Sequence, residues 1–209
     1  MPRVIERTVY RFHELSDKAK ARARDHYRAQ GVRDQWWDFV YEDAVRVANI
    51  LGISITEKSG PSPAIYFSGF SSQGDGACFQ GGYTPKPGNE TTEGIRSECP
   101  QDEELHRIAD ALALLQVSAR VQHGQRIEAN ITTSGSYCHS GTMNVDATYT
   151  EGDSPDPEIA EELQQLIRDF ADWIYARLED EYDWLNSNEH IDEALLDGDN
   201  EFEESGELV

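Results

Sequence analysis

The sequence predicts an α+β fold, a mainly antiparallel sheet covered by helices, with a long acidic helix near the C-terminal end. Short apolar runs of strand type follow one another with brief turns, which is typical of antiparallel strands. Helical spacing of apolar residues occurs at the beginning, middle and end of the chain, not between every pair of strands. The 209 residues, 38% of them hydrophobic, are enough to bury one core. We therefore expect one domain over residues 1–197, with an acidic helical segment over 155–197 and a disordered acidic tail over 198–209.

The first elements have clear boundary signals. Residues 3–12 alternate between apolar and polar side chains and predict a strand. Ser16 is a suitable N-cap for a helix over residues 17–30, which Gly31 ends. A second helix is predicted over residues 34–51, because its apolar residues recur every three or four positions.

The middle of the chain contains strand-type runs and one helix. Segments rich in glycine and proline separate the runs, as expected of tight connections. Composition predicts a loop over residues 85–98, and helical spacing predicts a helix over 100–116. The predicted strands cover residues 53–58, 64–70, 78–84, 117–123, 127–134 and 142–150.

The last long helix is the clearest element. From Pro157 to Leu185, apolar residues at three- and four-residue spacing form one continuous stripe. A shorter helix is predicted over residues 189–196. A long amphipathic helix can also form the seam of a homodimer, so a homodimer remains open.

The overall composition indicates the class of partner. The chain carries 40 acids and 18 bases, a net charge of −22, which repels nucleic acid and anionic membranes and favours a basic protein or nucleoprotein partner. No apolar run reaches the length of a signal peptide core or a membrane span. The chain has an odd number of cysteines, Cys78, Cys99 and Cys138, and their spacing is not that of metal ligands. We therefore expect free thiols and a cytoplasmic location. We also expect no metal and no cofactor.

The negative charge is concentrated in the last part of the chain. Residues 151–209 carry 21 acids and two bases, a net charge of −19. The other 150 residues carry 19 acids and 16 bases, and the first thirty are basic, with eight bases against four acids. The acidity is therefore a regional property.

Acids fill the positions that the apolar stripe of the long helix leaves free. One interpretation is a solvated helix face followed by a solubilising tail. The other is a negative surface for a basic partner, because like charges three and four positions apart destabilise a helix and need another explanation. The candidate partner-binding residues are Glu158, Glu161, Glu162, Asp169, Asp172, Glu179, Asp180, Glu181 and Asp183.

The glycine-rich segment Ser68–Gly82 is the most distinctive local feature. A phosphate-binding loop requires a following helix and usually a lysine, and this segment has neither. The pattern favours a tight β connection in which Asp75 accepts hydrogen bonds from turn amides. Ser72, Gln73 and Asp75 are the candidates if the loop binds a ligand.

A catalytic alternative uses Cys138 and His139, joined by Asp75 and Cys78 in one pocket. A cysteine–histidine pair needs the two side chains to meet in space, and neighbouring residues on a strand or turn usually point apart. The spacing contains no catalytic signature, so we assign no catalytic residue.

Three segments of the chain resemble a family of small proteins from bacteriophages and prophages, often labelled antitoxin-like. They read VYRFHELSDKAK, WWDFVYEDA and IYFSGFSSQGDGACF, at Val9–Lys20, Trp36–Ala44 and Ile65–Phe79. The resemblance covers roughly residues 8–150 and implies a phage setting, but no catalytic residues.

Together with the acidic segment, this resemblance suggests a phage-type inhibitor of a bacterial nucleic-acid-handling defence complex, such as a CRISPR or restriction effector. The inhibitor would act in the host cytoplasm and present carboxylates to a basic nucleic-acid channel. Two alternatives remain. One is an antitoxin-type protein that binds a basic toxin, and the other is an enzyme with a pocket near Asp75, Cys138 and His139.

Overall fold

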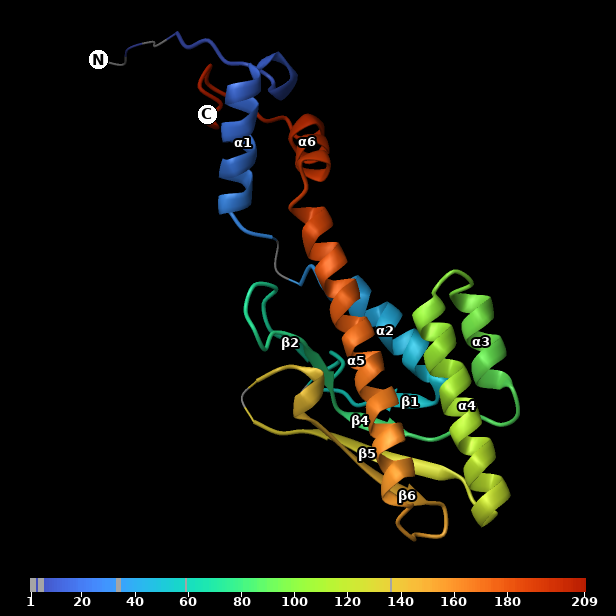
Figure 1. Cartoon of the computed structure of the whole chain (residues 1–209). Coiled ribbons are helices and arrows are strands. Elements are labelled where there is room, and N and C mark those ends of the chain that lie inside the picture. The colour runs from blue at the N-terminus through green and yellow to red at the C-terminus, as the bar shows by residue number, and fades with distance from the viewer. Residues whose placement is uncertain (1–2, 4–5, 33–34, 59, 136) are drawn as a thin grey trace. The chain divides into compact units, whose positions relative to one another are not determined.

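The computed structural model describes residues 3, 6–32, 35–58, 60–135 and 137–209 (Figure 1). Its combination of α-helices with antiparallel strands confirms the predicted α+β class. The chain divides into two compact units, whereas the sequence predicts one domain over 1–197. Unit 1 combines residues 1–36 with 180–209, and unit 2 consists of residues 37–179.

Unit 2 is built on a four-stranded antiparallel sheet of order β1-β4-β5-β6. Adjacent positions on β5 alternate between buried and solvent-facing side chains, so one face of the sheet forms the core. A separate antiparallel ribbon pairs β2 with β3. The strands are β1 Ile53–Ile55, β2 Ile65–Phe67, β3 Ala77–Phe79, β4 Gly81–Tyr83, β5 Ile127–Thr133 and β6 Met143–Tyr149.

Helices cover the buried face of this sheet. Gln116 of α4 is buried and exchanges hydrogen bonds of 2.9 and 3.0 Å with the backbone of Ile127, which fixes α4 against β5. Helix α5 also packs on the separate ribbon, where the ring of Phe170 lies edge-on against Phe79 of β3, with centroids 5.8 Å apart. The helices that contribute to unit 2 are α2 Asp38–Leu51, α3 Glu90–Glu98, α4 Glu103–His123 and α5 Pro157–Leu185.

The structure confirms the predicted bounds of α5. Its apolar stripe is fully buried at Leu163, Phe170 and Ile174, which explains why the sequence pattern is so regular. Within the described ranges, no helix is both long enough and apolar enough to cross a bilayer.

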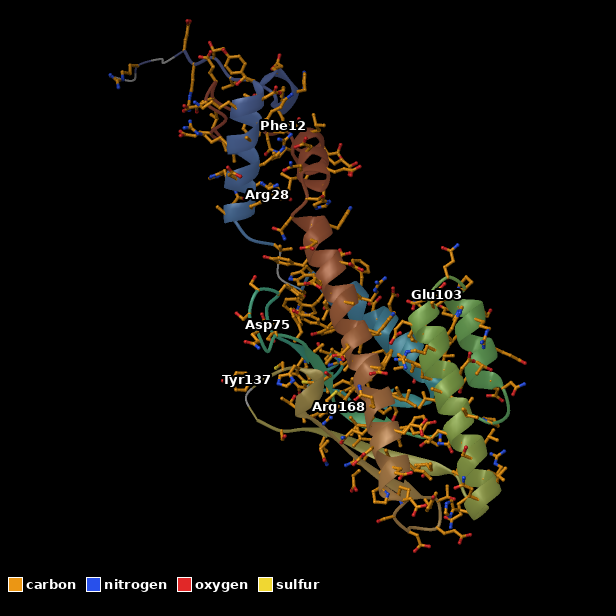
Figure 2. All side chains as sticks on the ribbon, in the orientation of Figure 1. Phe12, Arg28, Asp75, Glu103, Tyr137 and Arg168 are labelled. Carbon is orange, nitrogen blue, oxygen red and sulfur yellow. The ribbon has the colours of Figure 1, made fainter. Side chains whose placement is uncertain are left out.

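Unit 1 brings the two ends of the chain together. The 3₁₀ helix η1, Phe12–Glu14, precedes α1, Asp17–Ala29, and both pack against α6, Asn188–Asp197. Phe12, labelled in Figure 2, belongs to their shared apolar cluster. The other buried members of this cluster are Leu15, Ala19, Ala23, Ile191, Leu195 and Phe202.

The tail after Gly198 has a defined conformation, whereas the sequence predicts disorder over 198–209. Phe202 is only 2% exposed, and its backbone forms two hydrogen bonds, of 2.8 and 2.9 Å, with Tyr10. Gly206 has a φ of +90°, and a Cβ atom there would lie 2.1 Å from the carbonyl oxygen of Ala19. A single aromatic anchor and a glycine at a close backbone approach therefore hold this acidic segment.

Three other predictions differ from the structure. Of the predicted strand 3–12, the described residues form one isolated bridge at Tyr10 before η1 begins. The predicted loop 85–98 contains α3. The predicted strand 117–123 is the last part of α4, which continues until Gly124 ends it with a φ of +68°. The β-branched residues Val117 and Val121 favour a strand by propensity, but both face outward. Residues 117–123 are helical because tertiary packing of α4 buries Ala119.

The second helix also begins later than predicted. It starts at Asp38, and residues 35–37 form a turn, while position 34 lies outside the described residues.

Candidate functional site

Three candidate acids lie at the N-terminal end of α5. Glu158, Glu161 and Glu162 are exposed, because the apolar stripe occupies the opposite face of the helix. None of them forms an ion pair with a base in the parts of the chain that the structure describes. The helix dipole favours negative side chains at this end. These carboxylates are therefore accessible to a partner, and Glu158, in the first turn, also stabilises its own helix.

Asp169 serves a contact within unit 2. Arg107 of α4 forms an ion pair with Asp169, whose side chain is only 17% exposed. Gln165 donates a hydrogen bond of 2.7 Å to its other oxygen. Hydrogen bonds to Glu104 and Asp169 raise the pKa of Arg107. We therefore leave Asp169 out of the surface offered to a partner.

Asp172 also contacts its own unit. It lies near the 3₁₀ helix η2, Ser140–Thr142, and burial raises the pKa of Asp172 while a hydrogen bond from Ser140 opposes that shift. Arg168, labelled in Figure 2, lies one turn earlier in α5 and donates a hydrogen bond of 2.9 Å to the carbonyl oxygen of Met143. Both side chains help to join α5 to the connection between β5 and β6.

The remaining candidate acids crowd the C-terminal end of α5. They are Glu179, Asp180, Glu181 and Asp183, and the last turn of the helix contains no base. The helix dipole places negative potential at this end, so carboxylates there lower the stability of the helix. Glu179 and Asp183 are four positions apart, which adds repulsion between like charges.

Part of the acidity after α5 is matched by bases of the first thirty residues. Arg24 forms two hydrogen bonds, of 2.5 and 2.7 Å, with the carboxylate of Asp192. The side-chain hydrogen bond from Arg24 lowers the pKa of Asp192. Arg7 pairs with Glu203 in the tail. The basic first thirty residues therefore have an internal function in unit 1, which the charge count alone does not reveal.

The glycine-rich loop holds itself together through Asp75, as the sequence predicts. One carboxylate oxygen of Asp75 accepts hydrogen bonds of 3.0 and 2.7 Å from the backbone amides of Ser71 and Ser72. These backbone hydrogen bonds, with that from Ser72 first, lower the pKa of Asp75. Ser72 and Gln73 are exposed at the tip of the loop.

The same loop is tied to the segment before η2. The hydroxyl of Ser68 donates to the carbonyl oxygen of Cys138 at 3.2 Å and accepts from the amide of Gly76 at 3.1 Å. Gly76 has no room for a side chain, because a Cβ atom there would lie 2.6 Å from the Cβ of His139. The hydroxyl of Tyr175 on α5 donates to the carbonyl oxygen of Gly69 at 3.0 Å. These contacts give the loop a structural role.

The structure brings together only part of the proposed catalytic group. Cys78 is buried and hydrogen-bonds to Cys138, and burial raises the pKa of the Cys78 thiol to about 11. The Nδ1 atom of His139 accepts a hydrogen bond of 3.1 Å from the amide of Gly141. Within the described residues, no hydrogen bond joins His139 to Cys78 or Cys138, so the nucleophile–base contact that the catalytic alternative requires is not seen there.

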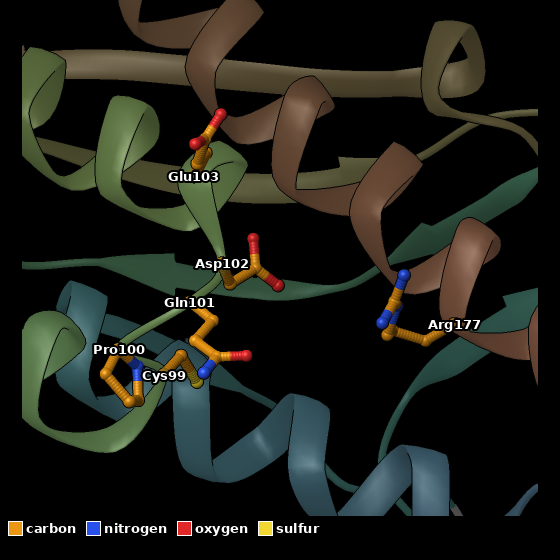
Figure 3. Close-up of a pocket in the computed structure, with 6 residues that line it drawn as sticks. All are labelled: Cys99, Pro100, Gln101, Asp102, Glu103 and Arg177. Atoms are coloured by element: carbon orange, nitrogen blue, oxygen red, sulfur yellow. The ribbon is translucent and has the colours of Figure 1, made fainter.

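A shallow pocket of about 660 Å³ lies where α4 begins (Figure 3). Asp102 and Arg177 point toward each other across it. One oxygen of Asp102 caps α4 by accepting from the amide of Leu105 at 3.0 Å, and the other accepts from the indole of Trp173 at 2.8 Å. Because both oxygens already have protein donors, this carboxylate is a structural cap.

A second pocket, of about 450 Å³, lies between the start of α2 and the hairpin that follows β1. Its wall includes the carboxylates Asp38, Glu42 and Glu57. The sequence pattern does not single out these residues, and the four-residue spacing of Asp38 and Glu42 is the one signal that points to them. The remaining lining residues are Tyr41, Val45, Ile55, Pro61, Ser62 and Pro63.

Comparison with known proteins supplies a family. No curated protein and no solved structure matches the chain. Residues 36–188 match the family model described as "Domain of unknown function (DUF8835)". The matched region includes all of unit 2 and leaves out α1 and nearly all of α6. Because the match covers well over half of the 209 residues, the chain belongs to the DUF8835 family.

Proposed function

We propose that this chain works by binding a basic protein or nucleoprotein complex through carboxylates of α5. The observation that carries this proposal is the position of Glu179, Glu181 and Asp183 near the C-terminal end of that helix, with no base in its last turn. Asp183 lies in the last turn, where a negative charge lowers helix stability, and Glu179 lies four positions before it, so helix formation does not account for this pair. Binding to a cationic surface does.

The target of this binding is a bacterial nucleic-acid-handling defence complex, a CRISPR or restriction effector, which the chain inhibits in the host cytoplasm. The resemblance of residues 8–150 to phage and prophage proteins supports this choice. Carboxylates at helical spacing would occupy the basic groove in place of phosphates, and the affinity would fall with added salt.

A tagged pull-down from bacterial lysate, after nuclease treatment, tests the proposal. The test variant is Glu179→Gln, Glu181→Gln and Asp183→Asn, which removes three charges from exposed or half-buried positions. Truncation before α5 is unsuitable, because it deletes the fully buried Leu163 and Phe170. We expect the unaltered chain to capture a salt-sensitive nucleic-acid-binding complex and the variant to lose it.

The matched control is Glu90→Gln, Glu93→Gln and Glu103→Gln, which makes the same change of charge at exposed positions outside α5. The control must retain the captured complex. Equal capture by the test variant would contradict the proposal. Capture of a small basic toxin in place of a nucleic-acid-binding complex would favour the antitoxin-type alternative.

A further inference from the structure

Two cysteine side chains lie in direct contact inside unit 2. Cys78, on β3, is only 2% exposed, whereas Cys138 is half-buried in the segment that precedes η2. The thiol of Cys78 forms hydrogen bonds with the side chains of Cys138 and Thr142. Neither cysteine lies on α5, so this contact is independent of the acids in the proposed function.

The backbone of unit 2 sets this contact. Gly76 extends the line of β3, because its carbonyl oxygen accepts a hydrogen bond of 3.1 Å from the amide of Ser68. A Cβ atom on Gly76 would lie 2.6 Å from the Cβ of His139 and 3.5 Å from the carbonyl oxygen of Cys138. Side chains two positions apart in a strand project from the same face, so Cys78 faces the same segment as Gly76. The fold therefore holds the two cysteines against each other.

The surroundings of the pair favour oxidation in a defined order. Cys138 is the more exposed of the two thiols, so a dissolved oxidant reaches it first. Burial raises the pKa of Cys78 to about 11, and the positive charge of Lys58 opposes this shift. A cation beside the pair stabilises the thiolate, which is the reactive form of cysteine. Cys78 is thus placed to react second, with a neighbour that has already been oxidised.

We propose that Cys78 and Cys138 form a reversible disulfide when a hydroperoxide oxidises Cys138. The Cys138 sulfur takes one peroxide oxygen and becomes a sulfenic acid, while the O–O bond breaks and water, or an alcohol, leaves. The Cys78 sulfur then attacks the sulfenic sulfur, the S–O bond breaks, and a second water leaves with the Cys78 proton. With hydrogen peroxide, two thiols and one peroxide give one disulfide and two waters.

The bond would join the β2–β3 ribbon to the connection between β5 and β6. It links positions sixty residues apart in the sequence, so it restricts the unfolded chain strongly. The oxidised protein should therefore have a Tm higher by on the order of 10 °C. A thiol reductant should reverse both the bond and the shift in Tm.

Treatment of the full chain with hydrogen peroxide, followed by alkylation in urea and mass spectrometry, tests the proposal. We expect the protein to lose the mass of two hydrogen atoms and to yield a tryptic fragment in which Cys78 is linked to Cys138. The third thiol, Cys99, should stay alkylated, and Cys99→Ser is the matched control that should form the bond unchanged. Dithiothreitol should restore the reduced mass.

Two single variants test the order of the steps. In Cys78→Ser, the sulfenic acid at Cys138 has no thiol to attack it, so dimedone should trap it there. In Cys138→Ser, the buried Cys78 should remain reduced over the same time. Lys58→Gln should slow formation of the bond several-fold, whereas Lys86→Gln, which removes a charge at an exposed position, should not.

The unaltered chain alone can refute the assignment, whether or not the variants fold. Oxidation of Cys138 to sulfinic acid without loss of two hydrogens would overturn it, and so would a linkage that uses Cys99 or a second chain. An oxidised form with a lower Tm would also contradict it, because the native contact would then not accommodate the bond. Trapping of a sulfenic acid at Cys78 would overturn the proposed order.

Discussion

Replacing Asp183 by asparagine should stabilise the protein. Asp183 lies in the last turn of α5, where the helix dipole makes a negative charge unfavourable by about 0.3–1 kcal/mol. Its repulsion from Glu179, four positions earlier, adds about 0.2–0.5 kcal/mol. Aspartate and asparagine have similar helix propensities, so the substitution changes mainly the charge. The expected gain in the free energy of unfolding is therefore about 1 kcal/mol.

Urea unfolding followed by circular dichroism measures this gain, and a thermal scan should show a Tm higher by about 2–4 °C. The gain should shrink at 1 M salt, where the screening length falls to about 3 Å. Glu158→Gln is the matched control, because it removes the same charge in the first turn of α5, where the dipole favours it. Its effect should be close to zero or destabilising by up to about 0.5 kcal/mol. Loss of stability in Asp183→Asn would refute the reasoning, because the acid would then support the fold.

Other predictions follow from the core and the buried groups. Phe202→Ala should lower the free energy of unfolding of unit 1 by about 3–5 kcal/mol, because Phe202 is buried. Hydrogen exchange of the α1 amides measures this change, and a disordered tail would give none. Cys78 should resist iodoacetamide in the native protein at pH 8, because burial raises its pKa to about 11, and rapid native labelling would contradict that burial. The unfolded thiol has a pKa of about 8.5. The stability that Cys78 contributes should therefore be complete below that pH and be lost as the pH rises toward 11. Urea unfolding midpoints measured between pH 8 and 11 would show this loss.

Local patterns predicted some elements well. The long helix was predicted over Pro157–Leu185 and occurs there, because its apolar stripe is regular over the whole length and has one buried face. The helix bounds at Ser16 and Gly52 also agree, because a hydroxyl cap and a left-handed glycine act through neighbouring backbone groups.

The errors arose where distant contacts decide the structure. Arg24 meets Asp192 across 168 positions of sequence, so no local pattern shows that part of the C-terminal acidity is neutralised. Phe202 is one aromatic residue among acids, and its burial depends on an apolar cluster formed by α1 and α6. The sequence does not predict the pocket carboxylates for the same reason, because Glu57 joins Asp38 and Glu42 only after the hairpin folds beside α2.

Unit 1 is made of two segments that lie far apart in the sequence, so its parts are synthesised at different times. Helix α1 leaves the ribosome before unit 2, but Ile191 and Phe202, which cover its apolar side, are translated more than 160 residues after it. At about 5–20 residues per second, α1 waits on the order of 10–30 seconds for these partners. Unit 2, with continuous sequence, can form its sheet during that interval. The apolar side of α1 is thus exposed in every nascent chain until Ile191 and Phe202 emerge, and a chain terminated before Phe202 never covers it completely.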